Sequence, residues 1–381
     1  MFTESLNNDK EGGCGKVFWK GTVSKLENSR GNLKMNKKFL AGFLCAVMAL
    51  GVAGCGGGDK KAANGASGAK AKPVTLKMNV TTAESSVWHV GAKAFKKTVE
   101  EKTGGRYIIQ IYGNEQLSAG DQAKGAEMLF NGATDCDLHS TMILSNVVSK
   151  LAVVSMPWIF PNGYKSVDEA IFNKGAKGAE FMKKEINAKG AHALAFGENG
   201  FRQITNNVRP ITKPEDLAGM KIRIPAIAIL VDVFRALKTD PTQMPFSECF
   251  TALQQGAIDG QENPYDTIRS AKLQEVQKYM TIWNYCYDPI TLSVSGKVWK
   301  SLSDADKKIF EDAAVAAMAE QVKASRALDA SIIKQFKDGG MKVNELDKAS
   351  IDKMKEAMKP VYAKYKDKFG VEAFTAFGYK F

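Results

Sequence analysis

Few residues of this sequence suit metal or acid–base chemistry. There are 3 histidines in 381 residues, and His89, His139 and His192 lack the spacing of a metal site. The 6 cysteines form no C-x-x-C pair, which argues against a zinc or thioredoxin-like site. The motifs G-x-x-x-x-G-K-[ST], G-x-S-x-G and G-x-G-x-x-G are also missing. We therefore expect no catalytic residue, no metal and no cofactor.

The composition is that of a globular protein, and its charge is unevenly distributed. Hydrophobic residues make up 44% and charged residues 25%, enough for a core of two ordinary domains or one large α/β unit. The net charge of +12 would suggest nucleic acid or an anionic membrane as partner. Residues 1–54 hold eight of the Lys and Arg and four of the Asp and Glu, so the remainder carries +8. Much of that remainder lies in residues 56–72 and 348–369, so we expect no nucleic-acid partner.

Residues 35–54 are similar to a bacterial lipoprotein signal peptide. Lys37 and Lys38 precede the uncharged run 39–54, whose sixteen residues fall short of the roughly 20 that span a bilayer. The run ends in VAG followed by Cys55, which resembles a lipobox. Cys55 would then carry lipid and become the first mature residue. The alternative is an ordinary signal peptide with a chance cysteine.

The segments on either side of this leader do not look like folded structure. We interpret residues 1–34 as a mis-assigned extension upstream of Met35, with a genuine cytoplasmic extension as the alternative. Residues 55–72 are rich in Gly, Ala, Lys and Ser, which predicts a flexible tether. A lipid on Cys55 would hold the folded part near a membrane. We therefore expect an exported protein in the periplasm or at the outer cell surface.

Strand-like and helix-like patterns alternate along the rest of the chain, which predicts βαβ units and a mostly parallel sheet. The expected strands are 74–80, 107–112, 134–138, 191–196, 221–224 and 290–295. The expected helices are 86–103, 120–131, 227–237, 247–255, 304–338 and 348–369. The segment 304–338 contains neither Pro nor Gly and keeps no strict heptad. These features favour one long helix over a coiled coil.

Four segments carry a resemblance to a known family. They are GFRQITN at 200–206, PEDLAGMKIRIP at 214–225, PFSE at 245–248 and QQGAIDGQENP at 254–264. Together they resemble the solute-binding proteins of TRAP transporters. The resemblance covers about residues 73–381, and its specific feature is the DGQENP run at its distance from KIRIP.

The resemblance implies an α/β fold of the two-lobed periplasmic-binding-protein type II-like class, with hinge strands and a long bracing helix. Lobe I would comprise residues 73–198 and about 289–328. Lobe II would comprise residues 199–288 and about 329–381. The lobes would close over a ligand by hinge motion.

The resemblance also implies the residues of the second lobe that bind the ligand. Arg223 matches the family's main carboxylate-binding arginine, and a guanidinium suits this role because it is planar, permanently charged and bidentate. Arg202 matches a second arginine, with a structural ion pair as its alternative role. Asn263 matches an amide contact to the ligand. Phe246 matches an aromatic wall, with a core role as its alternative.

The first lobe matches the family less closely. Glu84 is expected in the first strand–helix loop, a place that normally faces the ligand. Ser140 falls where some relatives carry an acidic contact. Trp158 and Tyr285 are plausible lining residues, as are Trp88, Gln116 and Trp283, with ordinary packing as the alternative for each.

The predicted function is capture of an organic acid and delivery of this acid to a TRAP membrane permease, without bond chemistry. The permease would use an ion gradient, so no nucleotide is expected on this chain. One alternative is a receptor for a different importer or a sensor. Another is a two-lobed α/β enzyme acting on a small acid, for which Asp259 and Glu262 are the candidate acid–base pair.

Overall fold

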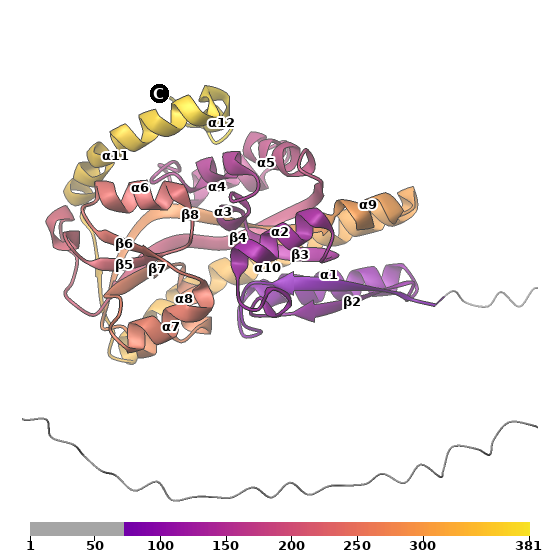
Figure 1. Ribbon diagram of the computed structural model, residues 1–381, viewed down its shortest axis with the longest axis horizontal. Helices are drawn as coiled ribbons and strands as arrows, with labels where there is room; N and C mark the ends of the chain where they lie inside the picture. The colour runs from indigo at the N-terminus through magenta and orange to yellow at the C-terminus, as the bar shows by residue number, and fades with distance from the viewer. Residues whose placement is uncertain (1–71) are drawn as a thin grey trace, which may run out of the picture. The chain divides into compact units, whose positions relative to one another are not determined.

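A computed structural model describes residues 72–381 of the chain (Figure 1). The predictions for residues 1–34, the signal peptide 35–54, Cys55 and nearly all of the tether lie outside the described residues. The strands are β1 (Val74–Val80), β2 (Tyr107–Tyr112), β3 (Cys136–Ser140), β4 (Ala191–Asn206), β5 (Lys221–Ile224), β6 (Asp240–Gln243), β7 (Gly260–Asn263), β8 (Tyr279–Ser295) and β9 (Lys342–Glu345).

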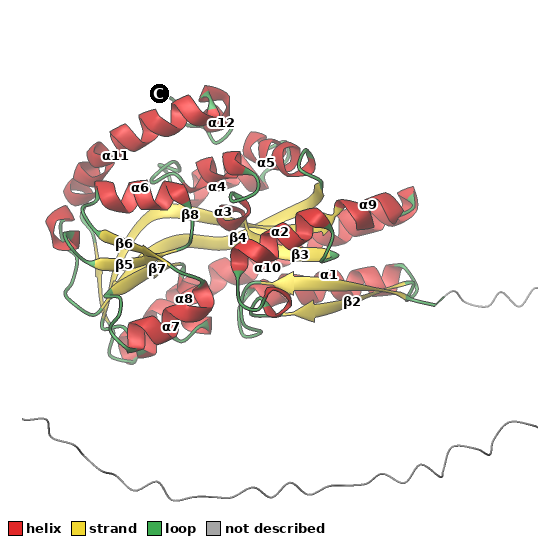
Figure 2. Ribbon diagram, viewed as in Figure 1, coloured by secondary structure: helices red, strands yellow, loops and turns green. Residues whose placement is uncertain are grey.

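Helices cover the sheet on both faces (Figure 2). The α-helices are α1 (Trp88–Lys102), α2 (Gln122–Asn131), α3 (Thr141–Leu144), α4 (Tyr164–Val167), α5 (Lys177–Asn187), α6 (Ala228–Ala236), α7 (Phe246–Gln254), α8 (Tyr265–Ser270), α9 (Gly296–Ser301), α10 (Asp304–Asp338), α11 (Lys348–Phe369) and α12 (Val371–Thr375). Short 3-10 or π-helical turns are η1 (Gln116–Ser118), η2 (Ser149–Ser155), η3 (Asp168–Phe172), η4 (Pro214–Leu217) and η5 (Leu273–Glu275). No described helix combines the length and hydropathy needed to cross a bilayer.

The strands form one mixed sheet in the order β2-β1-β3-β8-β4-β7-β5-β6, with β9 beside β8. Pairing is parallel between β1 and its neighbours β2 and β3, and between β5 and its neighbours β6 and β7. At the centre, β8 runs antiparallel to β3 and β4, and β4 runs antiparallel to β7. The sheet is therefore mostly parallel, as predicted, and the antiparallel pairs lie at its centre.

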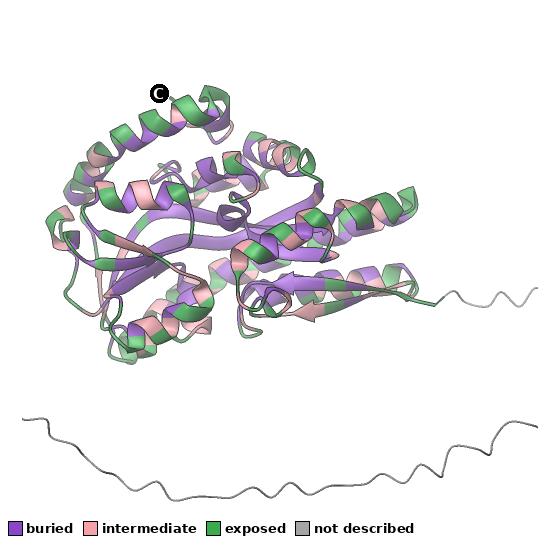
Figure 3. Cartoon of the chain, in the orientation of Figure 1, coloured by how far each residue is buried: buried purple, intermediate pink, exposed green. Residues whose placement is uncertain are grey.

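The two long central strands, β4 and β8, connect the ends of the sheet and are buried along most of their length (Figure 3). They were predicted only as the shorter strands 191–196 and 290–295. Their register shifts between the pairs Glu198↔Pro289 and Gly200↔Asp288. Proline cannot donate to a strand ladder, and it is tolerated in sheets at such irregular positions. The two places where the chain is predicted to pass between lobes, after residues 198 and 288, thus lie side by side in the sheet. The lobe boundaries themselves stay a prediction.

The long helix α10 was predicted with its observed bounds. It begins where the side chain of Ser303 accepts a hydrogen bond from the Asp306 amide (3.1 Å), a normal N-cap. Further along, Gln321 accepts from the Glu198 amide (2.8 Å) and donates to the Glu198 carbonyl (2.7 Å). A Cβ at Gly197 would lie 2.7 Å from the Gln321 side-chain oxygen, so glycine permits this close approach. The helix therefore holds β4 beside the register shift.

Three apolar clusters form the core. One packs α1 and the first part of α10 around β1, and a second packs α7, α8 and the end of α10. The third and largest joins residues 141–187, which were not assigned from the sequence, to α6, α11 and α12. Its residues in η2, such as Leu151 and Val153, are apolar without a helical or strand period. This explains why periodicity did not identify the segment.

Candidate ligand-binding site

A narrow cavity lies where the carboxyl ends of the two parallel sets of strands meet. We call it the inner cavity. It is lined by Thr81, Thr82, Trp88, Gln122, Ser140, Met142, Ile143, Asn199, Arg202, Arg223, Pro225, Phe246, Asn263, Thr267 and Asp288. Thr81 directly follows β1, Ser140 ends β3, and Asn263 ends β7. Ligands of open α/β sheets usually bind at this edge.

Arg223 lies in β5 with its side chain fully buried against the cavity wall. Its Nε and Nη2 atoms donate to the Met244 carbonyl at 3.2 and 2.8 Å. Within residues 72–381, no carboxylate forms an ion pair with Arg223, and its Nη1 atom has no hydrogen-bond acceptor. Burial lowers the pKa of Arg223, although a guanidinium remains charged. The structure thus places a buried positive charge beside the cavity without a countercharge.

Arg202, in β4, is also buried but is paired with two carboxylates. It forms a bidentate pair with Glu262, with Nη2 2.9 Å from Oε1, and its Nη1 atom lies 3.2 Å from Asp288. Burial alone would lower the pKa of Arg202, but the charges of Glu262 and Asp288 raise it. The environment of Arg202 matches the structural ion pair that was its alternative role.

Asp288 joins both ends of the sheet through a buried polar network. It accepts hydrogen bonds from Ser140 Oγ (2.6 Å) and Asn199 Nδ2 (2.8 Å) in addition to its contact with Arg202. Burial raises the pKa of Asp288, while Arg202 and these two hydrogen bonds oppose the shift. Ser140 therefore contacts a carboxylate of the protein and also lines the cavity.

Asn263 and Phe246 complete the part of the site that the sequence indicated. The Asn263 side chain accepts from Arg202 (3.0 Å) and donates to Gln261 (2.6 Å), which fixes its orientation. Phe246 begins α7, and its ring centre lies 5.5 Å from the Arg223 guanidinium carbon. At this distance the ring can contribute a cation–π interaction. Together with Arg223, Arg202 and Ser140, these two residues line one cavity.

Three predicted site residues do not line the inner cavity. Glu84 is exposed and pairs with Lys93 at 2.7 Å, and Lys93 lowers the pKa of Glu84. Tyr285 is fully buried behind the wall, and its hydroxyl donates to Glu262 (2.7 Å). Trp158 packs edge-to-face on Tyr285. Tyr285 therefore supports the partner of Arg202 from behind.

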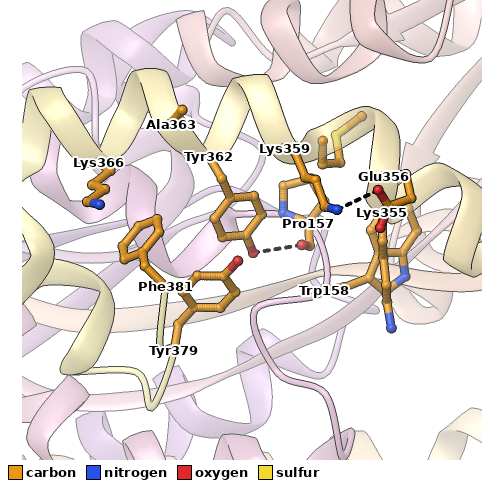
Figure 4. A pocket seen from close by; sticks show the side chains of 11 residues that line it. Pro157, Trp158, Lys355, Glu356, Lys359, Tyr362, Ala363, Lys366, Tyr379 and Phe381 are labelled. Carbon is orange, nitrogen blue, oxygen red and sulfur yellow. Dashed lines mark hydrogen bonds and ion pairs between the residues drawn. The ribbon is translucent and has the colours of Figure 1, made fainter.

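Trp158 also lines a separate groove beside the C-terminal helix α11 (Figure 4). In this groove the Tyr362 hydroxyl donates to the Pro157 carbonyl (2.8 Å), and the rings of Tyr362 and Tyr379 stack. The groove shares no wall residue with the inner cavity. Trp158, predicted to line the ligand site, therefore lines this groove instead.

Other wall residues were weighed only as lining residues or were not considered. Trp88 was considered as a lining residue, and its indole donates to Asn199 (3.2 Å), which also accepts from Thr267 (2.8 Å). Thr82 is buried, and its hydroxyl oxygen has no hydrogen-bond partner in the described part of the chain. A signal for Thr82 existed, because it is the second residue after a strand that leads to the cavity edge.

A second hollow, the outer groove, adjoins the inner cavity. It is lined by Thr81, Asn114, Glu115, Gly120, Gln122, Phe246, Ser247, Phe250, Ala271 and Leu273. Three of these residues, Thr81, Gln122 and Phe246, also line the inner cavity. Ser247 donates to the Gly120 carbonyl (3.2 Å) across the outer groove. The shared wall makes the outer groove the natural approach to the inner cavity.

Hydrogen bonds also join the start of α1 to α8. Asp266 accepts from Ser86 Oγ (2.7 Å) and from the Val87 amide (3.0 Å), and Arg269 donates to the Ser85 carbonyl (2.7 Å). These residues belong to different predicted lobes. Their contacts are those expected to break when the lobes separate.

Within residues 72–381, no cluster of His, Cys, Asp and Glu is suited to hold a metal ion. Cys136, Cys249 and Cys286 are free and buried. Burial raises the pKa of Cys249 to about 11, against the opposing charge of Arg223. The described cysteines are therefore protonated packing residues.

Comparison with known proteins agrees with this geometry. The model of bacterial extracellular solute-binding protein family 7 matches residues 78–368. A solute-binding protein of Verminephrobacter eiseniae is 34% identical over 308 residues, which cover 80% of this chain and 88% of the relative.

Solved structures show the same similarity. A TRAP periplasmic solute binding protein from Ralstonia eutropha with bound (S)-2-acetolactate is 34% identical, with a TM-score of 0.76 over 80% of this chain and 98% of that chain. One from Polaromonas bound to D-erythronate is 36% identical, with a TM-score of 0.74 over 80% and 97%. The chain thus has the two-lobed α/β fold of these proteins and belongs to family 7 of the bacterial extracellular solute-binding proteins, the solute receptors of TRAP transporters.

Proposed function

We propose that this protein captures an organic acid in the inner cavity and delivers it to a TRAP membrane permease. One observation carries the proposal: the buried guanidinium of Arg223 lines the cavity with no carboxylate paired to it among the described residues. A buried charge is costly unless it is paired. A ligand carboxylate would supply the missing countercharge.

The geometry at Arg223 suits a carboxylate. Nη1 is free, and Nη2 uses one of its two N–H groups on Met244, so both nitrogens can donate to a bound carboxylate. Such bidentate pairs are short, directional and stronger than neutral hydrogen bonds. Because the Arg223 guanidinium is already held by the Met244 carbonyl, its remaining N–H groups have a fixed direction.

The other wall residues orient this acid. We assign the amide contact to Asn263, an aromatic wall to Phe246 and a polar contact to Ser140. Arg202 contributes through its one remaining N–H group on Nη1, since Glu262 and Asp288 occupy the others. The relatives with bound acetolactate and erythronate support a small organic acid as the ligand.

The remaining predicted residues take indirect roles in this proposal. Tyr285 acts through Glu262, and Trp158 packs against Tyr285. Glu84 lies on the surface beside Lys93 and is assigned no contact with the acid in the closed form. As in its family, the protein would act as a receptor and not as an enzyme.

We also propose export and lipid anchoring through Cys55 after removal of residues 35–54. The uncharged run and the VAG-Cys55 sequence support this proposal. Cells that express the full chain should incorporate radiolabelled palmitate into it, and Cys55→Ser should abolish the label. An unlabelled wild-type protein would contradict the anchor and leave acid capture unaffected.

The test of acid capture is titration calorimetry of the purified protein with a panel of carboxylic acids. Arg223→Ala should cost about 2–5 kcal/mol of affinity for any acid that binds, because it removes one partner of a buried charge pair. Arg235→Ala, on the exposed side of α6, is the matched control and should bind like the wild type. Unchanged affinity in Arg223→Ala would show that the site assignment is wrong.

A further inference from the structure

The charges around the inner cavity limit the charge of the ligand. Two guanidiniums, Arg202 and Arg223, and two carboxylates, Glu262 and Asp288, form the buried set. Both carboxylates pair with Arg202, and neither pairs with Arg223. The wall contains no lysine or histidine. The cavity therefore offers one available positive charge, at Arg223.

A second carboxylate on the ligand would have no cation left. A monocarboxylate paired with Arg223 brings the buried set to three carboxylates and two guanidiniums. A dicarboxylate would bring it to four against two, and one of its ends would lie near Asp288 or Glu262. Burying a carboxylate without a paired cation is strongly unfavourable. The charge count thus disfavours dicarboxylates.

The uncharged part of the wall has unused hydrogen-bonding capacity. The Thr82 hydroxyl is unpartnered, and Asn199 and Asn263 each use one of their two amide N–H groups. Thr81 and Thr267 donate to Glu115 and Asn199, so their oxygens remain free to accept. Donors and acceptors are therefore mixed in this wall. Hydroxyl groups suit such a wall because each can both donate and accept.

We propose that the site selects monocarboxylates that carry several hydroxyl groups, and that it rejects dicarboxylates. The inference rests on the proposed capture of a carboxylate by Arg223 and adds the chemistry of the rest of the ligand.

A matched set of acids tests the proposed class of ligand. D-erythronate and L-threonate, succinate, and butyrate share four carbons and differ in hydroxyl groups and in the second carboxylate. The set is extended to aldonates of five and six carbons and the dicarboxylates of equal length. In titration calorimetry, at least one aldonate should bind at least about 100-fold more tightly than both the dicarboxylate and the unsubstituted acid of its length, because unpaired polar groups discriminate strongly.

The outcomes separate this inference from the proposed function. If succinate or a longer dicarboxylate binds as tightly as any aldonate and Arg223→Ala abolishes that binding, carboxylate capture stands and the inference falls. If butyrate binds as tightly as the aldonates, the hydroxyl requirement is wrong. If none of the acids binds, both the inference and the proposed function are contradicted.

Thr82→Val tests the hydroxyl contact directly. Valine keeps the shape of threonine, and the Thr82 hydroxyl has no partner to lose, so the fold should tolerate the change. We expect about a 5- to 20-fold loss for the preferred aldonate, equal to the loss of one hydrogen bond, and no change for the unsubstituted acid. An equal loss for both acids, or for neither, would overturn the role of Thr82 in selecting hydroxyl groups.

Discussion

The two buried arginines of the inner cavity show how environment decides the role of a residue. Arg202 and Arg223 lie in β4 and β5, with β7 between them in the sheet. Both are almost fully buried. Arg202 has two carboxylate partners, whereas Arg223 contacts a single backbone carbonyl. We therefore expect the first guanidinium to stabilise the fold, and we propose the second as the partner of a ligand carboxylate.

The largest expected effect is a loss of protein stability when the paired arginine, Arg202, is replaced. Arg202→Met leaves Glu262 and Asp288 buried without their cation, which should lower the free energy of unfolding by about 3–5 kcal/mol. Urea unfolding followed by circular dichroism measures the loss. The double variant Arg202→Met, Glu262→Gln should recover part of it. A loss below about 1 kcal/mol would contradict the structural role of Arg202.

A second test concerns Glu198, a buried carboxylate in the same strand as Arg202. Its ion-pair partner, Arg326, is partly exposed. Burial raises the pKa of Glu198 to about 7, although Arg326 (2.9 Å) and the Tyr287 hydroxyl (3.0 Å) oppose the shift. Its usual value is 4.5. Because the folded pKa is higher, this group contributes stability below about pH 4.5, and that contribution disappears as the pH rises through 7.

The expected contribution is about 2–3 kcal/mol across this window. Glu198→Gln cannot ionise, so its unfolding free energy should fall less between pH 4.5 and pH 8 than that of the wild type. Glu356→Gln, at an exposed position, serves as the control and should keep the wild-type slope. Identical slopes in wild type and Glu198→Gln would refute the raised pKa.

A smaller effect is expected at the aromatic neighbour of Arg223. Phe246→Leu removes the cation–π contact but keeps an apolar side chain, so affinity for the bound acid should fall by about 1 kcal/mol. Calorimetry with the preferred acid measures the change. Phe250→Leu, in the outer groove, is the matched control. Equal losses in the two variants would place the effect in packing and not in the cation–π contact.

The smallest effect is expected when the unpaired arginine, Arg223, is replaced and the stability of the protein is measured without ligand. Arg223→Met removes a buried charge together with its hydrogen bonds to Met244, and these changes offset each other. The unfolding free energy without ligand should stay within about 1 kcal/mol of wild type. A loss as large as that of Arg202→Met would erase the distinction between the two arginines.

Local patterns predicted much of the fold. The strands at 74–80 and 107–112 and the helix 304–338 were predicted with their observed bounds, since alternation, caps and missing breakers are visible in a short window. The long strand β4 was predicted only to residue 196, because its continuation contains buried polar residues such as Glu198 and Arg202. The strand β8 was likewise predicted only from residue 290, because Pro289 indicated a strand boundary.

The site was predictable in part. Arg223, Asn263 and Phe246 were predicted from their motif, and in the structure they line one cavity, while their contact with a ligand stays a prediction. The pairing of Arg202 with Asp288 joins residues 86 positions apart, and no local pattern reports such a contact. Glu84 satisfied the rule for strand–helix loops, yet its long side chain turns to Lys93 at the surface. Loop position alone does not specify where a side chain points.

The three buried cysteines offer a way to time how the core opens. Cys136, Cys249 and Cys286 each belong to a different one of the three apolar clusters. A thiol reacts with an alkylating reagent only as the thiolate and only when solvent reaches it. The rate at which each cysteine is alkylated therefore reports how often its own cluster opens to solvent. Mass spectrometry can measure the three rates separately without engineered probes.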